Sequence, residues 1–135
     1  MLDTGVTYAA LDRRDRAHKP CRTLIEEAQE TLIIPAATLP EVDYWTAKHL
    51  GPGALIALLR DVIDGAFVVV DLDAEDYTRV AEILDRYADQ NIGFVDAAVF
   101  ATVERLGEPK LATLDRRHFR VLRPRHVDAL KLLPG

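Results

Sequence analysis

The segment Asn91–Val103, with the sequence NIGFVDAAVFATV, decides which fold class we expect for this chain. Residues 91–93 indicate a turn, and the stretch Phe94–Val103 after it is apolar around most of the circumference that a helix would present. A helix that is apolar on nearly all sides belongs in the interior of a protein. Asp96, in the expected first turn, is the only ionisable residue of that stretch. We therefore expect a buried helix with a single acid at its start.

Short apolar runs elsewhere in the chain predict strands that alternate with helices. The expected strands are Thr31–Ile34, Phe67–Val70 and Lys110–Leu114, with a very short first strand that ends at Asp3. Amphipathic or capped patterns predict further helices around residues 6–11, 20–28, 38–51, 55–65 and 73–88, and the tail after Leu114 has no regular pattern. Continuously apolar strands separated by helices are typical of an α/β fold with a parallel sheet covered on both faces.

Length and composition fit one globular domain over residues 1–135. Apolar residues make up 49% of the chain, enough for a single core, and no apolar run approaches the roughly 20 residues of a membrane helix. No basic stretch follows Met1, so we expect no signal peptide. The lone Cys21 cannot form an internal disulfide, which fits a cytoplasmic protein.

The charged residues are unevenly distributed along the chain. The net charge of −5 by itself disfavours a nucleic-acid partner, but residues 24–112 hold 17 acids and 6 bases, whereas the two ends together hold 5 acids and 11 bases. The basic clusters are Arg13, Arg14, Arg16, Lys19 and Arg22, and then Arg116, Arg117, Arg120, Arg123 and Arg125. If the fold brings the two ends together, these cations form one basic rim that could hold a phosphate backbone. Alternatively, they are ordinary solvated charges, some of them paired with nearby acids.

Two acids follow predicted strands, and a third starts the buried helix. Asp3 and Asp115 stand at the carboxyl ends of strands, where ligands bind in parallel sheets. A buried carboxylate such as that of Asp96 is costly unless something satisfies it. The alternative for Asp96 is a helix cap, held by the free N–H groups and the dipole at the helix start.

Glu41 has an equally good structural explanation. Thr38 and Glu41 fit the capping-box pattern, in which the glutamate side chain reaches back to the backbone of the threonine. Asp43 lies on the same predicted helix and competes with Glu41 as a site residue. Asp89 is a further competitor, more simply explained as a solvated residue near a helix end.

Acids that gather at one end of a sheet predict a metal site. Asp3, Asp115 and the first turns of two helices would open onto the same edge, where carboxylates repel one another unless a cation neutralises them. No histidine or cysteine has the spacing of metal ligands, since His18, His49, His118 and His126 are scattered. Hard oxygen ligands favour one or two Mg²⁺ or Mn²⁺ ions over zinc, and such ions support chemistry at phosphates.

The ordered set of acids resembles the PIN-domain family, and more narrowly the VapC-type toxins of bacterial toxin–antitoxin pairs. The resemblance spans nearly the whole chain and rests on four segments: Leu2-Asp3-Thr4, Pro40-Glu41-Val42-Asp43-Tyr44, Ile92-Gly93-Phe94-Val95-Asp96-Ala97 and Thr113-Leu114-Asp115-Arg116-Arg117-His118-Phe119. Two departures stand out: the first strand is almost absent, and Gly5 occupies a position that is often serine in the family.

The resemblance implies a three-layer α/β/α sandwich with a short, mostly parallel sheet. It also implies a Mg²⁺- or Mn²⁺-dependent endoribonuclease that cleaves structured RNA such as tRNA or rRNA, neutralised by a cognate VapB-type antitoxin and usually forming dimers. Carried over, the four acids of the site are Asp3, Glu41, Asp96 and Asp115, of which Asp3, Asp96 and Asp115 would bind metal. Thr113 matches a hydroxyl position that orients a carboxylate, and Arg116 and Arg117 are candidates to hold the RNA backbone.

Two other functions remain open from the sequence. A phosphoacceptor receiver domain would use Asp71 at a strand end with Lys110 as its partner, although a receiver needs an acidic pair after the first strand and Asp3 stands alone. A PIN-like interaction protein without catalytic activity is compatible with the very short first strand.

Overall fold

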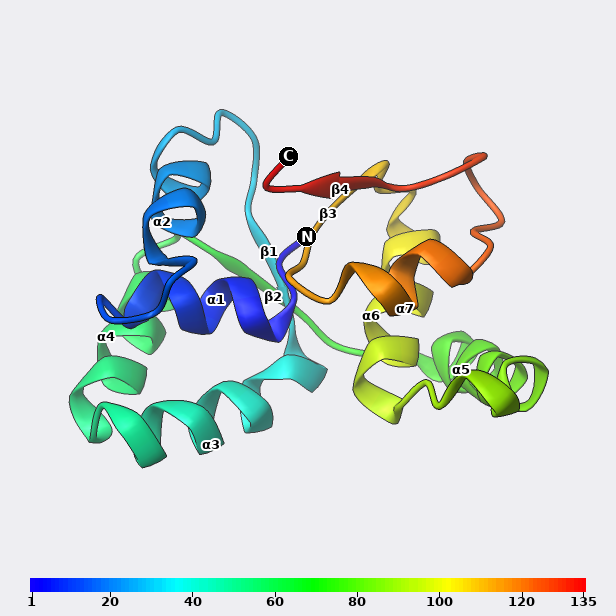
Figure 1. Cartoon of the computed structure of the whole chain (residues 1–135), viewed down its shortest axis with the longest axis horizontal. Coiled ribbons are helices and arrows are strands. Elements are labelled where there is room, and N and C mark those ends of the chain that lie inside the picture. Colours follow the sequence, from blue (N-terminus) through cyan, green and yellow to red (C-terminus); the bar gives the residue numbers. More distant parts are fainter.

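The computed structural model describes all residues 1–135 as helices packed around a small sheet (Figure 1). The elements are α1 (Thr4–Leu11), α2 (His18–Glu26), β1 (Ile33–Pro35), η1 (Ala36–Thr38), α3 (Leu39–His49), α4 (Pro52–Ile63), β2 (Val68–Val70), α5 (Ala74–Arg86), η2 (Ala88–Gln90), α6 (Phe94–Leu106), β3 (Lys110–Ala112), α7 (Arg116–Val121) and β4 (Lys131–Leu133). None of these helices has the length and apolar character needed to cross a membrane.

The first residues of the chain join two pairs of parallel strands. β1 pairs with β2, and β3 pairs with β4. Between these pairs, Leu2 forms a parallel bridge to Ala112 of β3, and its N–H donates to the carbonyl of Ile33 in β1 at 2.8 Å. The resulting order is β2, β1, the N-terminal residues, β3 and β4.

Successive residues along the central strands enter two different hydrophobic cores. Met1 and Leu111 pack with α5, α6 and α7, whereas Leu2 and Ala112 pack with the cluster formed by α1 to α4. This alternation is what a pleated strand requires, because neighbouring side chains point to opposite faces. The sheet therefore separates two helical layers, which confirms the expected α/β/α sandwich.

The buried helix is also confirmed. Every residue of α6 from Ala97 to Val103 is buried, and Phe100 has no exposed surface. The long helix α5 packs against it and begins with a capping box formed by Asp73 and Asp76. α6 ends at Gly107, whose φ of 66° is the left-handed conformation that glycine adopts readily.

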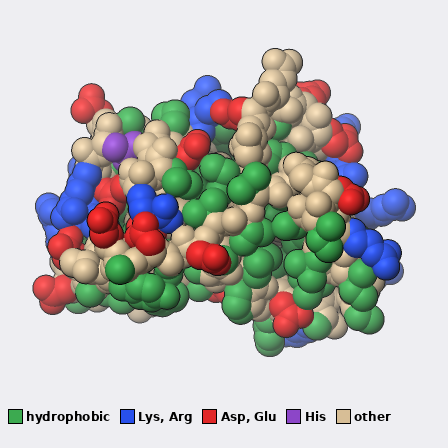
Figure 2. All heavy atoms as spheres, turned by 180° about the vertical axis from the view of Figure 1, so that it is seen from behind, with side chains coloured by type: hydrophobic (Ala, Val, Ile, Leu, Met, Phe, Trp, Pro, Cys, Tyr) green, Lys and Arg blue, Asp and Glu red, His purple; other side chains and the backbone are tan.

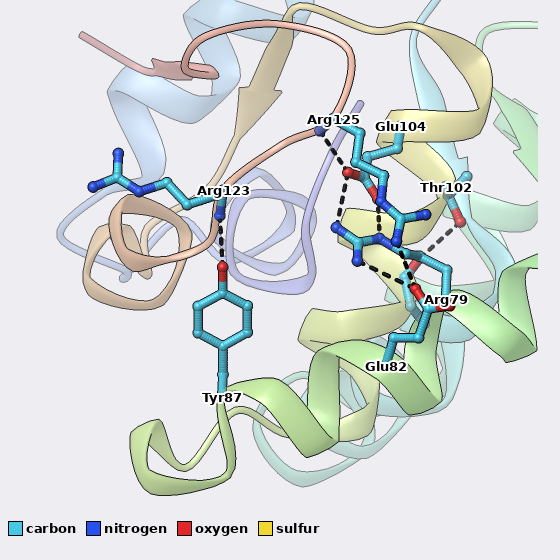
Figure 3. Close-up of polar contacts among 8 residues, drawn as sticks. Arg79, Glu82, Tyr87, Thr102, Glu104, Arg123 and Arg125 are labelled. Carbon is cyan, nitrogen blue, oxygen red and sulfur yellow. Dashed lines mark hydrogen bonds and ion pairs between the residues drawn. The ribbon is translucent and has the colours of Figure 1, made fainter.

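The C-terminal tail differs from the sequence prediction, because it forms α7 and the edge strand β4. Charged side chains hold the loop between these elements against α5 and α6 (Figure 3). Arg79 makes two hydrogen bonds to the carboxylate of Glu104, at 2.6 and 3.1 Å, and Glu104 also accepts from the backbone N–H of Arg125 at 2.8 Å. Tyr87 accepts from the backbone N–H of Arg123 at 3.2 Å. These contacts join residues 21–36 positions apart, which explains why local sequence pattern misses this segment.

The two basic clusters do not form a single rim. The first lies on α2 and the loop after α1, at the opposite side of the molecule from α7 and the loop that carry the second cluster (Figure 1). Several of the cations have partners within the chain: Arg22 pairs with Glu26 and Arg125 with Glu82. The cations therefore flank the sheet from two sides.

Seen from behind, the surface combines a broad apolar region with a mixed charged one (Figure 2). The exposed apolar residues of α4 and β2 include Ile56, Leu59, Ile63 and Val68, with 46%, 40%, 81% and 45% of their surface exposed. β2 pairs only with β1, so this apolar surface adjoins an open edge of the sheet.

Replacing Phe100 by alanine tests the central place of α6. We expect the free energy of unfolding to fall by about 3–5 kcal/mol, because the phenyl ring is fully buried and its loss leaves a cavity. Urea denaturation measures this change. As a control, Ile63→Ala, at a position with 81% exposure, should change it by less than about 0.5 kcal/mol. Equal effects of the two substitutions would contradict this account of the core.

Candidate metal centre

The four acids expected from the sequence line one cleft at the carboxyl ends of the strands. The cleft has a volume of about 470 Å³ and is lined by Asp3, Thr4, Gly5, Tyr8, Asp15, Glu41, Trp45, Asp96, Leu114 and Asp115. Asp43 and Asp89, the competing acids, are not among these residues. A cavity of about 530 Å³ at the opposite ends of the strands, beside Met1 and Lys110, contains none of the four acids.

Asp3 is the most buried acid of the cleft, with 5% of its surface exposed. Its position follows from the first strand, which ends there, and its Oδ1 caps α1 by accepting from the N–H of Thr4 at 2.8 Å. The pKa of Asp3 is raised to about 6, mainly because the carboxyl group is buried and to a lesser extent because the carboxylates of Asp96 and Glu41 lie nearby, while hydrogen bonds from Thr113 and Thr4 oppose the shift.

Thr113 links the first acid to the last. Its hydroxyl donates to Oδ2 of Asp3 at 2.8 Å and accepts from the backbone N–H of Asp115 at 3.0 Å. The side chain of Thr113 is fully buried, so its rotamer is fixed by packing. Thr113 thus orients a carboxylate, as the family resemblance implied.

Glu41 faces the cleft, and the expected capping box is absent. The hydroxyl of Thr38 donates to the carbonyl of Pro35 at 2.8 Å and makes no cap contact. Glu41 accepts instead from the hydroxyl of Thr4 at 2.6 Å, a contact between the first turns of α3 and α1. The capping alternative is wrong because the turn η1 places Thr38 in a helical conformation, in which its side chain bonds backward.

Asp96 does not cap its helix either. Gly93 is the N-cap residue of α6, and no side chain accepts from the first-turn N–H groups. Oδ2 of Asp96 lies 2.7 Å from Nδ1 of His118, which lies in turn 3.1 Å from Oδ2 of Asp115. Because carboxylates only accept, Nδ1 of His118 carries the proton between them.

His118 is the site residue that sequence reasoning missed. It is on α7, a helix that the sequence pattern did not predict, and it stands 22 residues from Asp96. The sequence signal was its place three residues after Asp115, the spacing that puts two side chains on one face of a helix. The prediction that all four histidines are scattered was therefore wrong for this one.

The donor set suits a hard divalent cation. One atom each of Asp96, Asp115 and His118 lie within 4.8 Å of one another, and Asp3 and Glu41 line the same cleft outside this group. Burial raises the pKa of Asp96, with the carboxylates of Asp115 and Glu41 adding to the shift against the hydrogen bond from His118. Oδ1 of Asp96 and Oε2 of Glu41 make no hydrogen bond within the protein, which leaves them free to bind a cation. Crowded carboxylates of this kind are stabilised by a cation with oxygen ligands.

Arg116 and Arg117 differ in their surroundings. The guanidinium of Arg116 donates to the carbonyl of Pro134, whereas Arg117 is exposed and makes no side-chain hydrogen bond. Of the two arginines after Asp115, Arg117 is therefore the one free to contact a ligand.

Comparison with known proteins identifies the family of this chain. The sequence model of the PIN domain matches residues 1–123. The chain belongs to the PIN-domain family. It is 32% identical over 124 residues to Ribonuclease VapC26 of Mycobacterium tuberculosis, and the match covers 92% of each chain.

Two solved structures share this PIN fold. VapC20 of Mycobacterium tuberculosis, described as a sarcin–ricin loop cleaving toxin, gives a TM-score of 0.75 at 20% identity, covering 82% of this chain and 85% of that one. VapBC2 from Rickettsia felis, bound to a DNA fragment from its promoter, gives a TM-score of 0.68 at 18% identity, covering 98% and 95%. At these identities the two structures show the fold alone.

The PIN fold rules out the receiver-domain alternative. Lys110 is at the start of β3, paired with Glu30, at the far end of the sheet from Asp71.

The raised pKa of Asp3 predicts a pH-dependent stability in metal-free protein. The folded state holds the Asp3 proton up to about pH 6, whereas the unfolded chain loses it near pH 3.8. The folded state thus loses about 3 kcal/mol relative to the unfolded chain as the pH rises through this range. Asp3→Asn lacks this titration. In urea denaturation with EDTA, the free energy of unfolding of the variant minus that of the wild type should therefore increase between pH 4 and 7. A difference that stays constant with pH would contradict the assignment.

Substitutions of His118 test whether its Nδ1–H positions the carboxylates of Asp96 and Asp115. His118→Asn would keep an amide N–H near the position of Nδ1, whereas His118→Ala removes the donor and His118→Gln moves it one bond outward. We expect His118→Ala and His118→Gln to weaken Mn²⁺ binding roughly 10-fold or more, and His118→Asn to stay near the wild type, as measured by calorimetry. Equal Mn²⁺ affinity in all three variants would show that His118 does not position the carboxylates.

Proposed function

We propose that this chain is a toxin endoribonuclease that uses one or two Mg²⁺ or Mn²⁺ ions to hydrolyse a phosphodiester bond in structured RNA such as tRNA or rRNA. The observation that supports it most is the meeting of four carboxylates, one of them deeply buried, in a single cleft of a PIN fold. The 32% identity to a named VapC ribonuclease over 92% of the chain agrees with this activity.

Each acid has a distinct place in the proposed mechanism. Asp3 and Asp96, both with raised pKa values, would hold the cation directly, and the more exposed Asp115 would bind it directly or through water. A bound divalent ion lowers the pKa of its water and stabilises charge on the phosphate. Glu41, fixed by Thr4, would orient the attacking water from the other side of the cleft. Arg117 would hold the RNA backbone beside Asp115.

A VapB-type antitoxin and a second copy of the chain are the proposed protein partners. The structural neighbour solved as a VapBC complex supports a partner of this kind, as do the exposed apolar residues of α4 and β2 described above. Apolar surface of this extent favours association with another protein. The antitoxin would cover the cleft, and the free toxin would act in the cytoplasm.

Neutralising one acid tests the proposed activity. Asp96→Asn should lower Mn²⁺-dependent cleavage of total tRNA and rRNA by at least about 100-fold, because it removes a charge that holds the metal. Asp43→Asn is the matched control, since Asp43 is exposed on α3 and does not line the cleft. Cleavage products are followed on denaturing gels, with EDTA as a second control. Undiminished cleavage by a folded Asp96→Asn protein would remove Asp96 from the site.

A further inference from the structure

Two aromatic side chains form part of the wall of the acidic cleft. Tyr8 of α1 and Trp45 of α3 line it together with the four acids. Each follows a polar residue of the cleft by four positions, Thr4 before Tyr8 and Glu41 before Trp45, a spacing that puts both members of a pair on one face of a helix. The helices that position the site thus also present aromatic rings one turn farther along.

Trp45 contacts three neighbours on its own helix while much of its ring stays accessible. The ring of His49 is parallel to the indole, with an interplanar angle of 2° and 5.9 Å between centroids. Nζ of Lys48 lies over the indole ring, 5.4 Å from its centroid, and Tyr44 meets Trp45 edge to face with 5.1 Å between ring centroids. Trp45 nevertheless keeps 40% of its surface exposed. Tryptophan is highly buried on average, so this exposure leaves an unusual amount of indole surface available to a ligand.

A flat exposed ring with a cation beside it is the usual means of holding an unpaired base. Bases splayed out of RNA loops stack on aromatic side chains, and a neighbouring cation meets the phosphate. We propose that Trp45, with His49 and Lys48 against its indole, is a stacking platform for an unpaired nucleobase next to the phosphate that a cation bound to the carboxylates would hold. This inference rests on the proposed ribonuclease function and adds to it the class of nucleotide that the cleft accepts.

The lining of the cleft favours a base over a peptide. Leu114 is the only aliphatic side chain among the residues that line it. Grooves that receive an amphipathic helix present rows of apolar side chains, and here such residues lie on α4, outside the cleft. Trp45 shares its cleft with acids that would hold a metal and, through the metal, a phosphate. Because stacking needs an unstacked base, we expect cleavage in loops and single-stranded segments, with little in continuous duplex.

Trp45 is the only tryptophan of the chain, so its fluorescence reports directly on stacking. The probes are 2′-O-methyl hexamers of uridine and of adenosine, which resist cleavage, and a hexamer of the same charge without bases. With saturating Mg²⁺, we expect both base-bearing hexamers to quench Trp45 emission and the abasic hexamer to leave it unchanged. Binding is followed separately by anisotropy of fluorescein-labelled hexamers.

Substitutions then measure how much the platform contributes. Trp45→Leu should weaken binding of the base-bearing hexamers about 5- to 150-fold, the range for loss of one stacked base, and Trp45→Phe should recover part of the affinity. Tyr77→Leu is the control, because Tyr77 is an aromatic residue with 57% exposure on α5, outside the cleft. Circular dichroism verifies that each variant is folded.

Three results would overturn the platform. The first is equal affinity of the protein for abasic and base-bearing hexamers. The second is that a base-bearing hexamer binds without quenching Trp45 emission. The third is that purified antitoxin quenches Trp45 emission and no RNA does. If wild-type protein cleaves tRNA or rRNA while any of these holds, the platform alone fails. If the wild type cleaves no RNA with Mg²⁺ or Mn²⁺, the proposed function fails and the platform with it.

Discussion

Three main-chain hydrogen bonds at the N-terminus hold the sheet and the cleft together. The N–H of Leu2 donates to Ile33 at 2.8 Å, that of Asp3 to Ala112 at 2.9 Å, and that of Ala112 to Met1 at 2.9 Å. They join the β1–β2 pair to the β3–β4 pair, which are not paired with each other directly. Because the chain turns into α1 directly after these bonds, Asp3 is fixed at the carboxyl edge of the sheet. The short first strand therefore supports a complete site.

The carboxylates that meet at this edge work against the stability of the fold unless a cation is bound. Three hydrogen-bond donors limit that cost, one for each of three acids: Thr113 for Asp3, Thr4 for Glu41, and His118 for Asp96. Oε2 of Glu41 and Oδ1 of Asp96 stay free to bind another ligand. This arrangement is typical of sites that give up stability for function, since the acids are positioned before the metal arrives.

Sequence alone predicts the parts of this structure that depend on local pattern. The apolar run of α6, the strand ends at Asp3 and Asp115, and the capped start of α5 can all be recognised from a few adjacent residues. α7 and β4 could not be predicted, because they are short and the loop between them is held by Glu104 and Tyr87, which are far away in the chain. His118 was missed for the same reason. The hydrogen bond from Thr4 to Glu41 could not be predicted, because the two residues are 37 positions apart and a cap within the helix of Glu41 was the local alternative.

The central claim is that the cleft of this PIN-domain protein binds a divalent cation through its carboxylates. The most direct measurement is the position of Mn²⁺ in a crystal of the wild-type protein, located by anomalous scattering. The account predicts a peak in the cleft, within coordination distance of Asp3 and Asp96. A crystal at saturating Mn²⁺ that shows no peak there, or peaks only elsewhere on the protein, would contradict it.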